Sequence, residues 1–486
     1  MKNETPSPEF ENLLLLLKSA EHYKLGLQIA VNYEKEFEAH FKCSVKEYEE
    51  LIDFLLNNNY YSRVILNRVL RIHYNHKYIV KVPKSIVLLS NLKELKLNGN
   101  NSPVLSENIG YLRNLRILEL ELNEFTCLPE SIWHLQRLVR LSVASNKFTV
   151  LPESIKELRK LHALDVSKNQ LTFLPESIGE LENLMRLDVS KNQIITLSEN
   201  FTELKNLQYL NISDNQLSFL PENIKEFLKL KVLILERNKL DALPENIGKL
   251  QKLRYLNLSL NNLTCLTENI GKLQNLQYLN LSLNNLTFLP ESLGNLRKTT
   301  RLSLYGNQLT FLPESIGSLR RLGSLDLSGN ELTFLPESIT KLKKLEKLDL
   351  SFNEIVFMPK NIGELENLKH LDLSRNQLTS LPESIGELQE LQKLYLTYNQ
   401  LMSLPESIGE LKKSYILNLS HNKLTNLPES ISKLKNLTLL NVVNNPLISL
   451  PKELKNFANC QIFVGKNPTQ ELREYVKDWK NIFYED

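Results

Sequence analysis

The sequence predicts an α/β solenoid in which a coil of 23 residues repeats along the chain and contributes one strand to a parallel sheet. Two observations predict this class. Asparagine recurs every 23 residues from Asn100 to Asn445, fifteen steps without insertion or deletion. Leucine stands five residues before each of these sixteen asparagines, and Leu, Val or Ile stands three residues before. Units this short cannot bury their apolar side chains alone, so they must stack in register.

The residues before each asparagine predict a short strand. Leucine alternates with variable residues, so that Leu164 and Val166 point inward and Asp165 points outward. One such strand per coil gives a parallel ladder with a spacing of ~4.8 Å. The other fixed leucine positions then fill a continuous core behind the sheet.

The asparagine itself is expected to be buried where the chain leaves the strand. Its side chain both donates and accepts hydrogen bonds, so it can pair with the backbone of adjacent coils. Aspartate cannot donate and leucine can do neither, which explains why this position is constant.

The second half of each coil is expected to return on the outer side through a short helical turn. Proline lies six residues after thirteen of the sixteen asparagines, the exceptions being Ser106, Ser198 and Thr267, and the sequence ESIGxL follows. Six phenylalanines share the position four residues after asparagine, and we interpret them as packing inside the return loop: Phe173, Phe219, Phe288, Phe311, Phe334 and Phe357.

The consensus LxxLxLxxNxLTxLPESIGxL resembles the leucine-rich repeat family, in the intracellular 23-residue LPxxIxxL subclass of Ras-pathway scaffolds, plant disease-resistance-like proteins and bacterial proteins. The resemblance covers residues 69–467. It implies a right-handed solenoid, or horseshoe, with the parallel sheet on its concave face and short helical turns outside.

Both ends are expected to carry caps, because a solenoid otherwise exposes two sheet edges. Residues 1–68 read as helices, with a capping box of Ser44 and Glu47 before an amphipathic run, and we interpret them as a helical cap in preference to an independent domain. Residues 69–83 form a degenerate first coil with Lys77 in place of asparagine, and Ile462, Val464 and Asn467 form a last strand. Residues 468–486 predict a C-terminal capping helix with an apolar face, which comprises Leu472, Val476, Trp479 and Phe483.

Composition excludes several classes of function. Lys+Arg 59 against Asp+Glu 56 is too balanced for a nucleic-acid binder, and no apolar run approaches the ~18 residues of a membrane span. The first residues do not read as a signal peptide. Cys127 and Cys265 lie six coils apart and Cys43 and Cys460 lie in opposite caps, so we expect free thiols and a cytoplasmic location. An edge-sealed solenoid is expected to be monomeric.

Searches for catalytic, phosphate-binding and zinc-binding motifs find none, which predicts a protein that is not an enzyme and needs neither cofactor nor metal. Function is then expected on the outward residues of the concave sheet, at six, four and two residues before each asparagine. Tyrosines with asparagine neighbours predict a partner-binding patch there, because tyrosine is a favoured interface anchor. Its residues are Tyr209, Asn211, Ile234, Tyr255, Asn257, Tyr278, Asn280 and Tyr305. Near-identical coils (YLNLSLNNLT twice) leave duplication as the alternative explanation.

A second group continues this face toward the C-terminus. Asp326, Asp349 and Asp372 stack one per coil, beside Lys347, His370 and Lys393, and Tyr395 follows. Stacked carboxylates raise one another's pKa and favour a basic partner. Because the lysines offset their charge, we interpret this group as a solvated face and not as a metal site.

Three hypotheses about function follow. The first is a non-enzymatic scaffold that binds a protein partner on the concave face, in intracellular signalling. The second is a bacterial effector that acts on a host protein by binding it. The third is a catalytic activity in residues 1–68, which we disfavour because so small a segment that also caps a solenoid rarely holds an active site.

Overall fold

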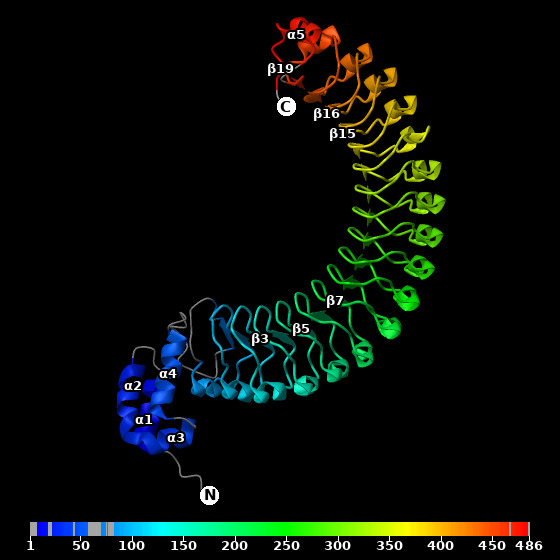
Figure 1. Ribbon diagram of the computed structural model, residues 1–486. Helices are drawn as coiled ribbons and strands as arrows, with labels where there is room; N and C mark the ends of the chain where they lie inside the picture. The colour runs from blue at the N-terminus through cyan, green and yellow to red at the C-terminus, as the bar shows by residue number, and fades with distance from the viewer. Residues whose placement is uncertain are drawn as a thin grey trace. The chain divides into compact units, whose positions relative to one another are not determined.

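The computed structural model describes residues 7–17, 22–41, 44–56, 70–73, 75, 82–465 and 468–484, and the chain divides into two compact units, residues 1–216 and 217–486. In each unit three-residue parallel strands alternate with 3-10 helical turns, one of each per coil (Figure 1). The predicted leucine-rich repeat solenoid with a parallel sheet and outer helical turns is therefore confirmed.

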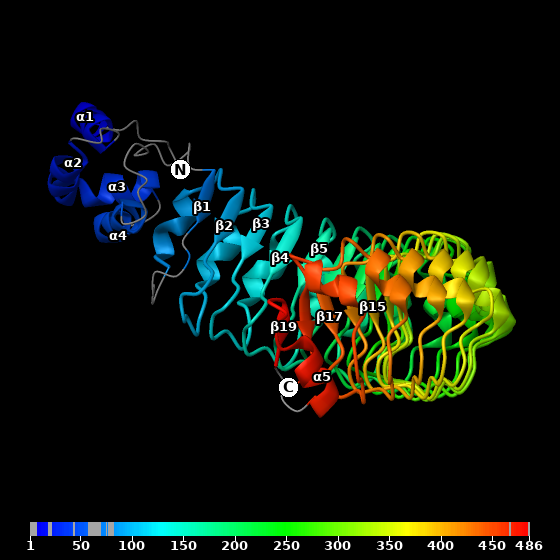
Figure 2. The ribbon, with the colours of Figure 1, turned by 90° about the horizontal axis from the view of Figure 1, so that it is seen from above.

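The first unit opens with four α-helices, which gather at the end of the unit that holds β1 (Figure 2). They are α1 (Pro8–Leu17), α2 (Tyr23–Ala30), α3 (Glu34–Phe41) and α4 (Val45–Leu56). The predicted capping box begins α4: Ser44 N–H donates to Glu47 Oε2 over 3.0 Å, and Glu47 N–H donates to Ser44 Oγ over 3.2 Å. α4 packs against the return turn that follows β1, η3 (Lys84–Leu88), where Ser85 Oγ donates to Glu47 O. The helices thus contact the first coil on its outer side.

Among the described residues of this unit seven strands follow, and each pairs in parallel with the next in register. Their bounds are β1 (Arg71–His73), β2 (Glu94–Lys96), β3 (Ile117–Glu119), β4 (Arg140–Ser142), β5 (Ala163–Asp165), β6 (Arg186–Asp188) and β7 (Tyr209–Asn211). Ile72 of the degenerate first coil is fully buried on β1. Val69, Tyr74, Lys77 and Ile79, which we also assigned to that coil, lie outside the described residues.

The second unit holds twelve strands in the described residues. They are β8 (Val232–Ile234), β9 (Tyr255–Asn257), β10 (Tyr278–Asn280), β11 (Arg301–Ser303), β12 (Ser324–Asp326), β13 (Lys347–Asp349), β14 (His370–Asp372), β15 (Lys393–Tyr395), β16 (Ile416–Asn418), β17 (Leu439–Asn441), β18 (Gln461–Phe463) and β19 (Ile482–Phe483). Within this unit the strands lie on the inner side of a curve and the 3-10 turns on the outer side (Figure 1). Its strand side is therefore concave, as predicted.

The return turns are 3-10 helices of five residues that begin seven residues after each asparagine, from η4 (Glu107–Tyr111) to η18 (Glu429–Lys433), with the shorter η15 (Ile362–Glu364) as an exception. Between each strand and its turn, the leucines point inward and are buried, whereas the six phenylalanines that follow asparagine by four residues are 45–65% exposed. The expectation that these phenylalanines pack inside the return loop is therefore wrong, because the adjacent leucine already fills the interior.

The asparagine ladder is confirmed in atomic detail. In one coil, Asn261 Nδ2 donates to Leu258 O (3.0 Å) of its own coil and to Leu235 O (2.9 Å) of the preceding coil. Its Oδ1 accepts the N–H of Leu240, also in the preceding coil, over 3.0 Å. Each asparagine therefore joins its own turn to the coil before it.

The residue immediately before each ladder asparagine has a left-handed backbone in all sixteen coils, with φ between 52° and 67°. Thirteen of these residues are not glycine, and they include Phe352, Arg375, Tyr398 and His421. Sequence analysis did not find this feature, because glycine, the residue that usually marks it, stands at only three of the sixteen positions.

The C-terminal helix is shorter than predicted. α5 (Gln470–Val476) ends seven residues before Phe483, and Ile482 and Phe483 form β19, which pairs in parallel with β18. Leu472 and Val476 are buried as expected, while Trp479 and Phe483 lie outside the helix. Backbone bonds from Ile462 N–H to Asn481 O (2.8 Å) and from Val464 N–H to Phe483 O (3.0 Å) cover this edge of the sheet. Asn467, predicted in the last strand, lies outside the described residues.

Candidate functional site

The outward residues of the strands, at six, four and two residues before each asparagine, form what we call the strand face. Register pairing lines each column up from coil to coil. Strand positions four and six residues before asparagine are variable, whereas the inward leucine between them is constant. The residue types on this face can therefore differ from coil to coil without altering the core.

Two tyrosines form the centre of the strand face in the second unit. The rings of Tyr255 and Tyr278 stack with centroids 4.3 Å apart and planes 1° from parallel. Both side chains are half-buried, and Val232 and Ile234 of β8 pair with Tyr255 and Asn257 of β9. The stack holds both rings in one orientation before any partner arrives, so little conformational freedom remains to be lost on binding.

The asparagines beside these tyrosines differ in availability. Asn257 is buried: its Nδ2 donates to Glu236 Oε2 (3.0 Å), and its Oδ1 accepts Oγ–H of Ser259 (2.8 Å). Asn280 is only partly buried, and its Oδ1 accepts the N–H of Ser282 over 3.0 Å. Asn280 is thus the more accessible of the two amides, while the side chain of Asn257 is held at the strand exit.

Tyr209 and Asn211 lie on β7 in the first unit. The guanidinium of Arg186 lies 3.6 Å from the centroid of the Tyr209 ring, and Asn211 Nδ2 donates to Asp188 Oδ2 over 3.1 Å. Burial raises the pKa of Tyr209, with Asp188 adding to the rise and Arg186 opposing it. Tyr209 lies on the strand face as predicted, whereas its cation–π contact with Arg186 was not predicted from the sequence.

The three aspartates occupy one column, as predicted, and their carboxylates close turns at the strand exits. Asp326 and Asp349 each accept the Oγ–H of the serine two residues later, over 2.6 and 2.7 Å. Asp372 accepts the N–H of Ser374 over 2.9 Å. Burial raises the pKa of Asp372, and the neighbouring Asp349 raises it further. In the described part of the chain no three His, Cys, Asp or Glu side chains group to hold a metal ion.

A ladder of stacked side chains is formed by the residues that stand immediately before the ladder asparagine, in the left-handed conformation, in successive coils. The Arg375 guanidinium lies 5.0 Å from the Phe352 ring centroid and 4.3 Å from that of Tyr398. Tyr398 stacks on His421 at 3.9 Å, and Asn444 Nδ2 lies 2.8 Å from His421 Nε2. Burial lowers the pKa of His421, and Arg375 lowers it further. The sequence signal for this ladder was the 23-residue spacing of its alternating aromatic and basic residues.

Tyr305, 44% exposed, and the partly buried Tyr395 complete the predicted set on this unit.

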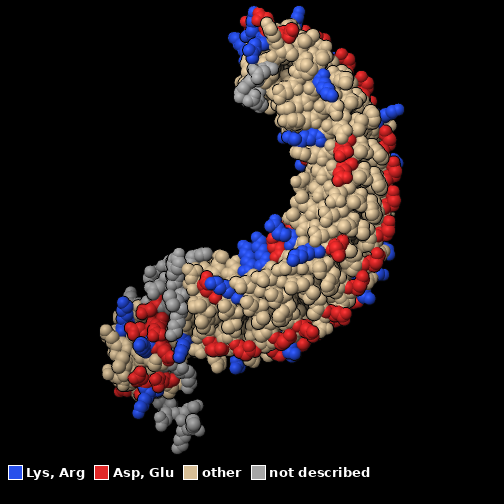
Figure 3. Space-filling model, in the orientation of Figure 1, with Lys and Arg blue, Asp and Glu red and all other residues tan. Residues whose placement is uncertain are grey.

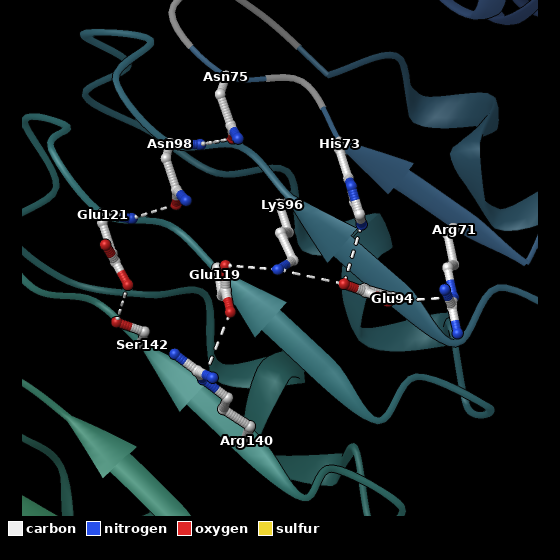
Figure 4. Close-up of polar contacts among 10 residues, drawn as sticks. All are labelled: Arg71, His73, Asn75, Glu94, Lys96, Asn98, Glu119, Glu121, Arg140 and Ser142. Carbon is white, nitrogen blue, oxygen red and sulfur yellow. Dashed lines mark hydrogen bonds and ion pairs between the residues drawn. The ribbon is translucent and has the colours of Figure 1, made fainter.

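A charged network covers the strand face of β1 to β4 in the first unit (Figure 4). Glu94 lies between Arg71 (3.3 Å), His73 (2.9 Å) and Lys96 (3.2 Å), and Lys96 also reaches Glu119 at 3.1 Å. Arg140 pairs with Glu119 on the far side at 3.3 Å. The two glutamate side chains are only 12% and 8% exposed. This network was not predicted from the sequence, although both outward columns of β1 to β4 hold acidic and basic residues.

These charges offset one another. Burial opposes ionisation of Glu94, but hydrogen bonds from Lys96 and His73 outweigh it and lower the pKa of Glu94. Burial likewise opposes the charge on Lys96, and bonds to Glu119 and Glu94 outweigh it and raise the pKa of Lys96. Each buried carboxylate is thus paired with at least two cationic side chains, as the burial of a charge requires.

Comparison with protein families matches residues 141–222, 222–310 and 357–463 to a family described as leucine-rich repeat region, and residues 300–355 to one described as leucine rich repeat. A search of curated proteins gave no significant match. Among the described residues, no helix has the length and apolar character needed to span a membrane.

Three solved structures are similar to this chain. A leucine-rich repeat protein of Leptospira interrogans is 33% identical, with 82% of this chain and 96% of that one covered and a TM-score of 0.62. YopM from Yersinia enterocolitica is 25% identical, with 87% and 92% covered and a TM-score of 0.61. The plant peptide hormone receptor RGFR1, solved in complex with RGF2, is 28% identical, with 80% and 76% covered and a TM-score of 0.60.

Proposed function

Because the chain belongs to the leucine-rich repeat family, we propose that it is a non-enzymatic scaffold whose strand face binds a protein partner. The observation that carries this proposal is the stacked pair of Tyr255 and Tyr278, which is half-buried and held in place without a ligand. The complex of RGFR1 with RGF2 supports the proposal, since a protein similar to this chain is a peptide hormone receptor solved with RGF2 bound.

The binding centre that we propose comprises Tyr255, Tyr278 and Asn280, with Ile234 as its apolar edge. Two parallel rings offer a large, rigid apolar surface with hydroxyl groups at the rim, which is the chemistry of interface hot spots. Tyr305 and Tyr395 extend the contact along the second unit, and Tyr209 with Asn211 provides a further contact on the first. Asp326, Asp349 and Asp372 favour basic side chains of the partner.

We place this binding in the cytoplasm and in signalling. The free thiols of Cys127, Cys265 and Cys460 support a reducing compartment. The same face serves the second hypothesis, a bacterial effector that binds a host protein, which the similar structures from Leptospira and Yersinia favour. Detection of the chain in host cytosol during infection distinguishes the two settings.

The test is a quantitative pull-down from native lysate that compares the wild type with Tyr255→Ala/Tyr278→Ala. We expect a protein that the wild type retains and the variant loses, with Kd raised at least about tenfold once that partner is purified. Tyr111→Ala is the matched control, because Tyr111 is 62% exposed on a return turn. Equal retention by all three folded proteins, checked by circular dichroism, contradicts the proposal.

A further inference from the structure

Four exposed phenylalanines follow one another on consecutive coils of the second unit, away from the strand face. Phe288, Phe311, Phe334 and Phe357, which we call the phenylalanine stripe, are 45%, 46%, 55% and 65% exposed. They lie in the segment that links each strand to its 3-10 turn. Rows of exposed aromatic rings are uncommon on proteins that bind nothing there.

The fold does not require phenylalanine at this position. The equivalent residue is Ala242, Ser380 or Ser403 in other coils of the same unit, and those coils have the same strand and turn. The interior is filled instead by the next residue, such as Leu312 or Leu335, which is 4% or 6% exposed. The four rings are therefore a surface feature that the core does not explain.

Backbone hydrogen bonds between coils align the stripe. Glu331 N–H donates to Leu309 O over 3.0 Å, and Glu354 N–H donates to Leu332 O over 3.0 Å. Gln308 N–H donates to Leu286 O over 2.9 Å in the coil before. These bonds hold the linking segments side by side in register, so that one ring per coil forms a line.

The charges beside the stripe are almost all negative. Glu331 and Glu354 stand three residues before a stripe phenylalanine, and Glu291, Glu314 and Glu337 stand three residues after one, while Lys360 is the single cation at these positions. All five glutamates are exposed. Within the described part of the chain, none of them lies within 4.0 Å of a basic nitrogen. Acidic side chains also follow one another along the outer side of this unit (Figure 3).

We propose that the phenylalanine stripe docks a basic amphipathic helix of a partner protein. A helix lying along the stack presents one apolar residue per turn of ~5.4 Å, close to the ~4.8 Å between neighbouring strands, so that each turn meets one ring. Lysine or arginine on either side of its apolar line then meets the glutamates on either side of the stripe. This surface is separate from the strand face and leaves that face free for a second partner.

The test uses a fluorescent helical peptide of about 15 residues, roughly four turns, built only from leucine on one face and lysine elsewhere. Its affinity for the full-length protein is measured by anisotropy. We expect Phe311→Ser/Phe334→Ser to raise Kd at least tenfold, with serine chosen because Ser380 and Ser403 already occupy this position. The matched control, Phe173→Ser/Phe219→Ser, removes two equally exposed rings outside the stripe and should leave Kd unchanged.

The charge requirement has its own variant. The variant Glu331→Lys/Glu354→Lys keeps the rings and should also weaken binding of the lysine peptide. A peptide with glutamate in place of lysine should bind the wild type at least tenfold more weakly than the lysine peptide does. Equal Kd for wild type, stripe variant and control overturns the proposal, as does equal binding of the two peptides.

Two other occupants of the stripe, a second copy of the chain or a lipid surface, would give different results, and either result would contradict the proposed helix. If the stripe joins two copies of the chain, sedimentation shows a wild-type dimer that Phe311→Ser/Phe334→Ser abolishes. If it meets a lipid surface, vesicles of phosphatidylcholine with phosphatidylserine bind the wild type and not this variant. We expect neither, because glutamates on both sides of the stripe repel a second copy and an anionic membrane.

Discussion

At the scale of the residue, the asparagine that repeats every 23 positions is the part of the molecule that sequence reasoning predicts best. An amide both donates and accepts, and the position had to satisfy backbone groups of two coils. The structure assigns Asn261 the carbonyls of Leu235 and Leu258 and the N–H of Leu240. What the sequence could not reveal is exposure: the phenylalanines that we expected inside lie outside, since leucine at the next position takes the interior.

Replacing Asn261 with alanine is expected to lower the free energy of unfolding by about 3 kcal/mol or more, because buried backbone groups of two coils lose their partners and each costs about 1–3 kcal/mol. The measurement is urea unfolding followed by circular dichroism. Asn262→Ala, an exposed neighbour, is the control and should change stability by less than about 0.5 kcal/mol. Similar losses for both variants would mean that the ladder is not what holds the coils.

At the scale of the element, the strand face could be predicted as a set of columns but not as a set of contacts. Tyr255 and Tyr278 were recognised from their spacing, whereas the network around Glu94 and the stacking of Arg375 depend on side-chain conformations that spacing does not determine. The C-terminal helix was predicted too long because the apolar spacing through Phe483 fits a helix. The uncovered edge of β18 gains backbone bonds when Ile482 and Phe483 become a strand, and that gain prevails.

The network around Glu94 predicts a dependence of stability on pH. Because its folded pKa lies below its usual value, ionised Glu94 stabilises the first unit above its unfolded pKa, and this contribution is lost as pH falls through the folded pKa. Glu94→Gln should cost about 2 kcal/mol at pH 7 and make the decline in acid shallower. The measurement is the urea midpoint from pH 7 to pH 3. Glu180→Gln, on an exposed pair with Lys156, is the control and should leave the profile unchanged.

Cys460 reports on the C-terminal edge. It is 2% exposed, and burial raises its pKa to about 12, so thiol reagents should reach it only when this end opens. Asn481 Nδ2 donates to Leu454 O and Phe457 O, and Asn481→Ala should weaken the edge by about 2 kcal/mol and speed labelling of Cys460 about 30-fold. Mass spectrometry measures the rate, with exposed Cys265 of the same molecule as control. If both thiols label at unchanged rates, β19 and its neighbours do not protect this edge.

At the scale of the whole molecule, the constant repeat explains why the fold class could be predicted when the site could not. Stacking needs only one asparagine and a few leucines per coil, so the sequence repeats what the core needs and varies everything else. Partner chemistry depends on the variable positions, which no rule of spacing constrains. At the ends, where the repeat stops, the N-terminal helices and their capping box were predicted correctly, but the C-terminal helix was predicted too long.

Deleting one whole coil, residues 262–284, is expected to leave a folded protein. After the deletion Asn285 directly follows Asn261, just as it directly follows Asn284 in the wild type, so the 23-residue register is kept. The melting temperature should fall by no more than a few degrees. Deleting Asn262 alone leaves one coil of 22 residues inside the regular array and displaces the inward leucines of that coil from those of its neighbours, so it should lower the melting temperature by more than deletion of the whole coil does. Circular dichroism melts compare the two. If the one-residue deletion is the better tolerated, register does not govern this fold.

The left-handed residue before each asparagine affects which side chains the surface of this protein can carry. An L-residue in that conformation costs roughly 1–2 kcal/mol more than glycine, and three coils do use glycine: Gly99, Gly306 and Gly329. Thirteen coils keep a side chain there despite the cost. The surface can therefore carry almost any residue type at this position, and four of these side chains, Phe352, Arg375, Tyr398 and His421, stack from coil to coil and so offset part of the backbone cost.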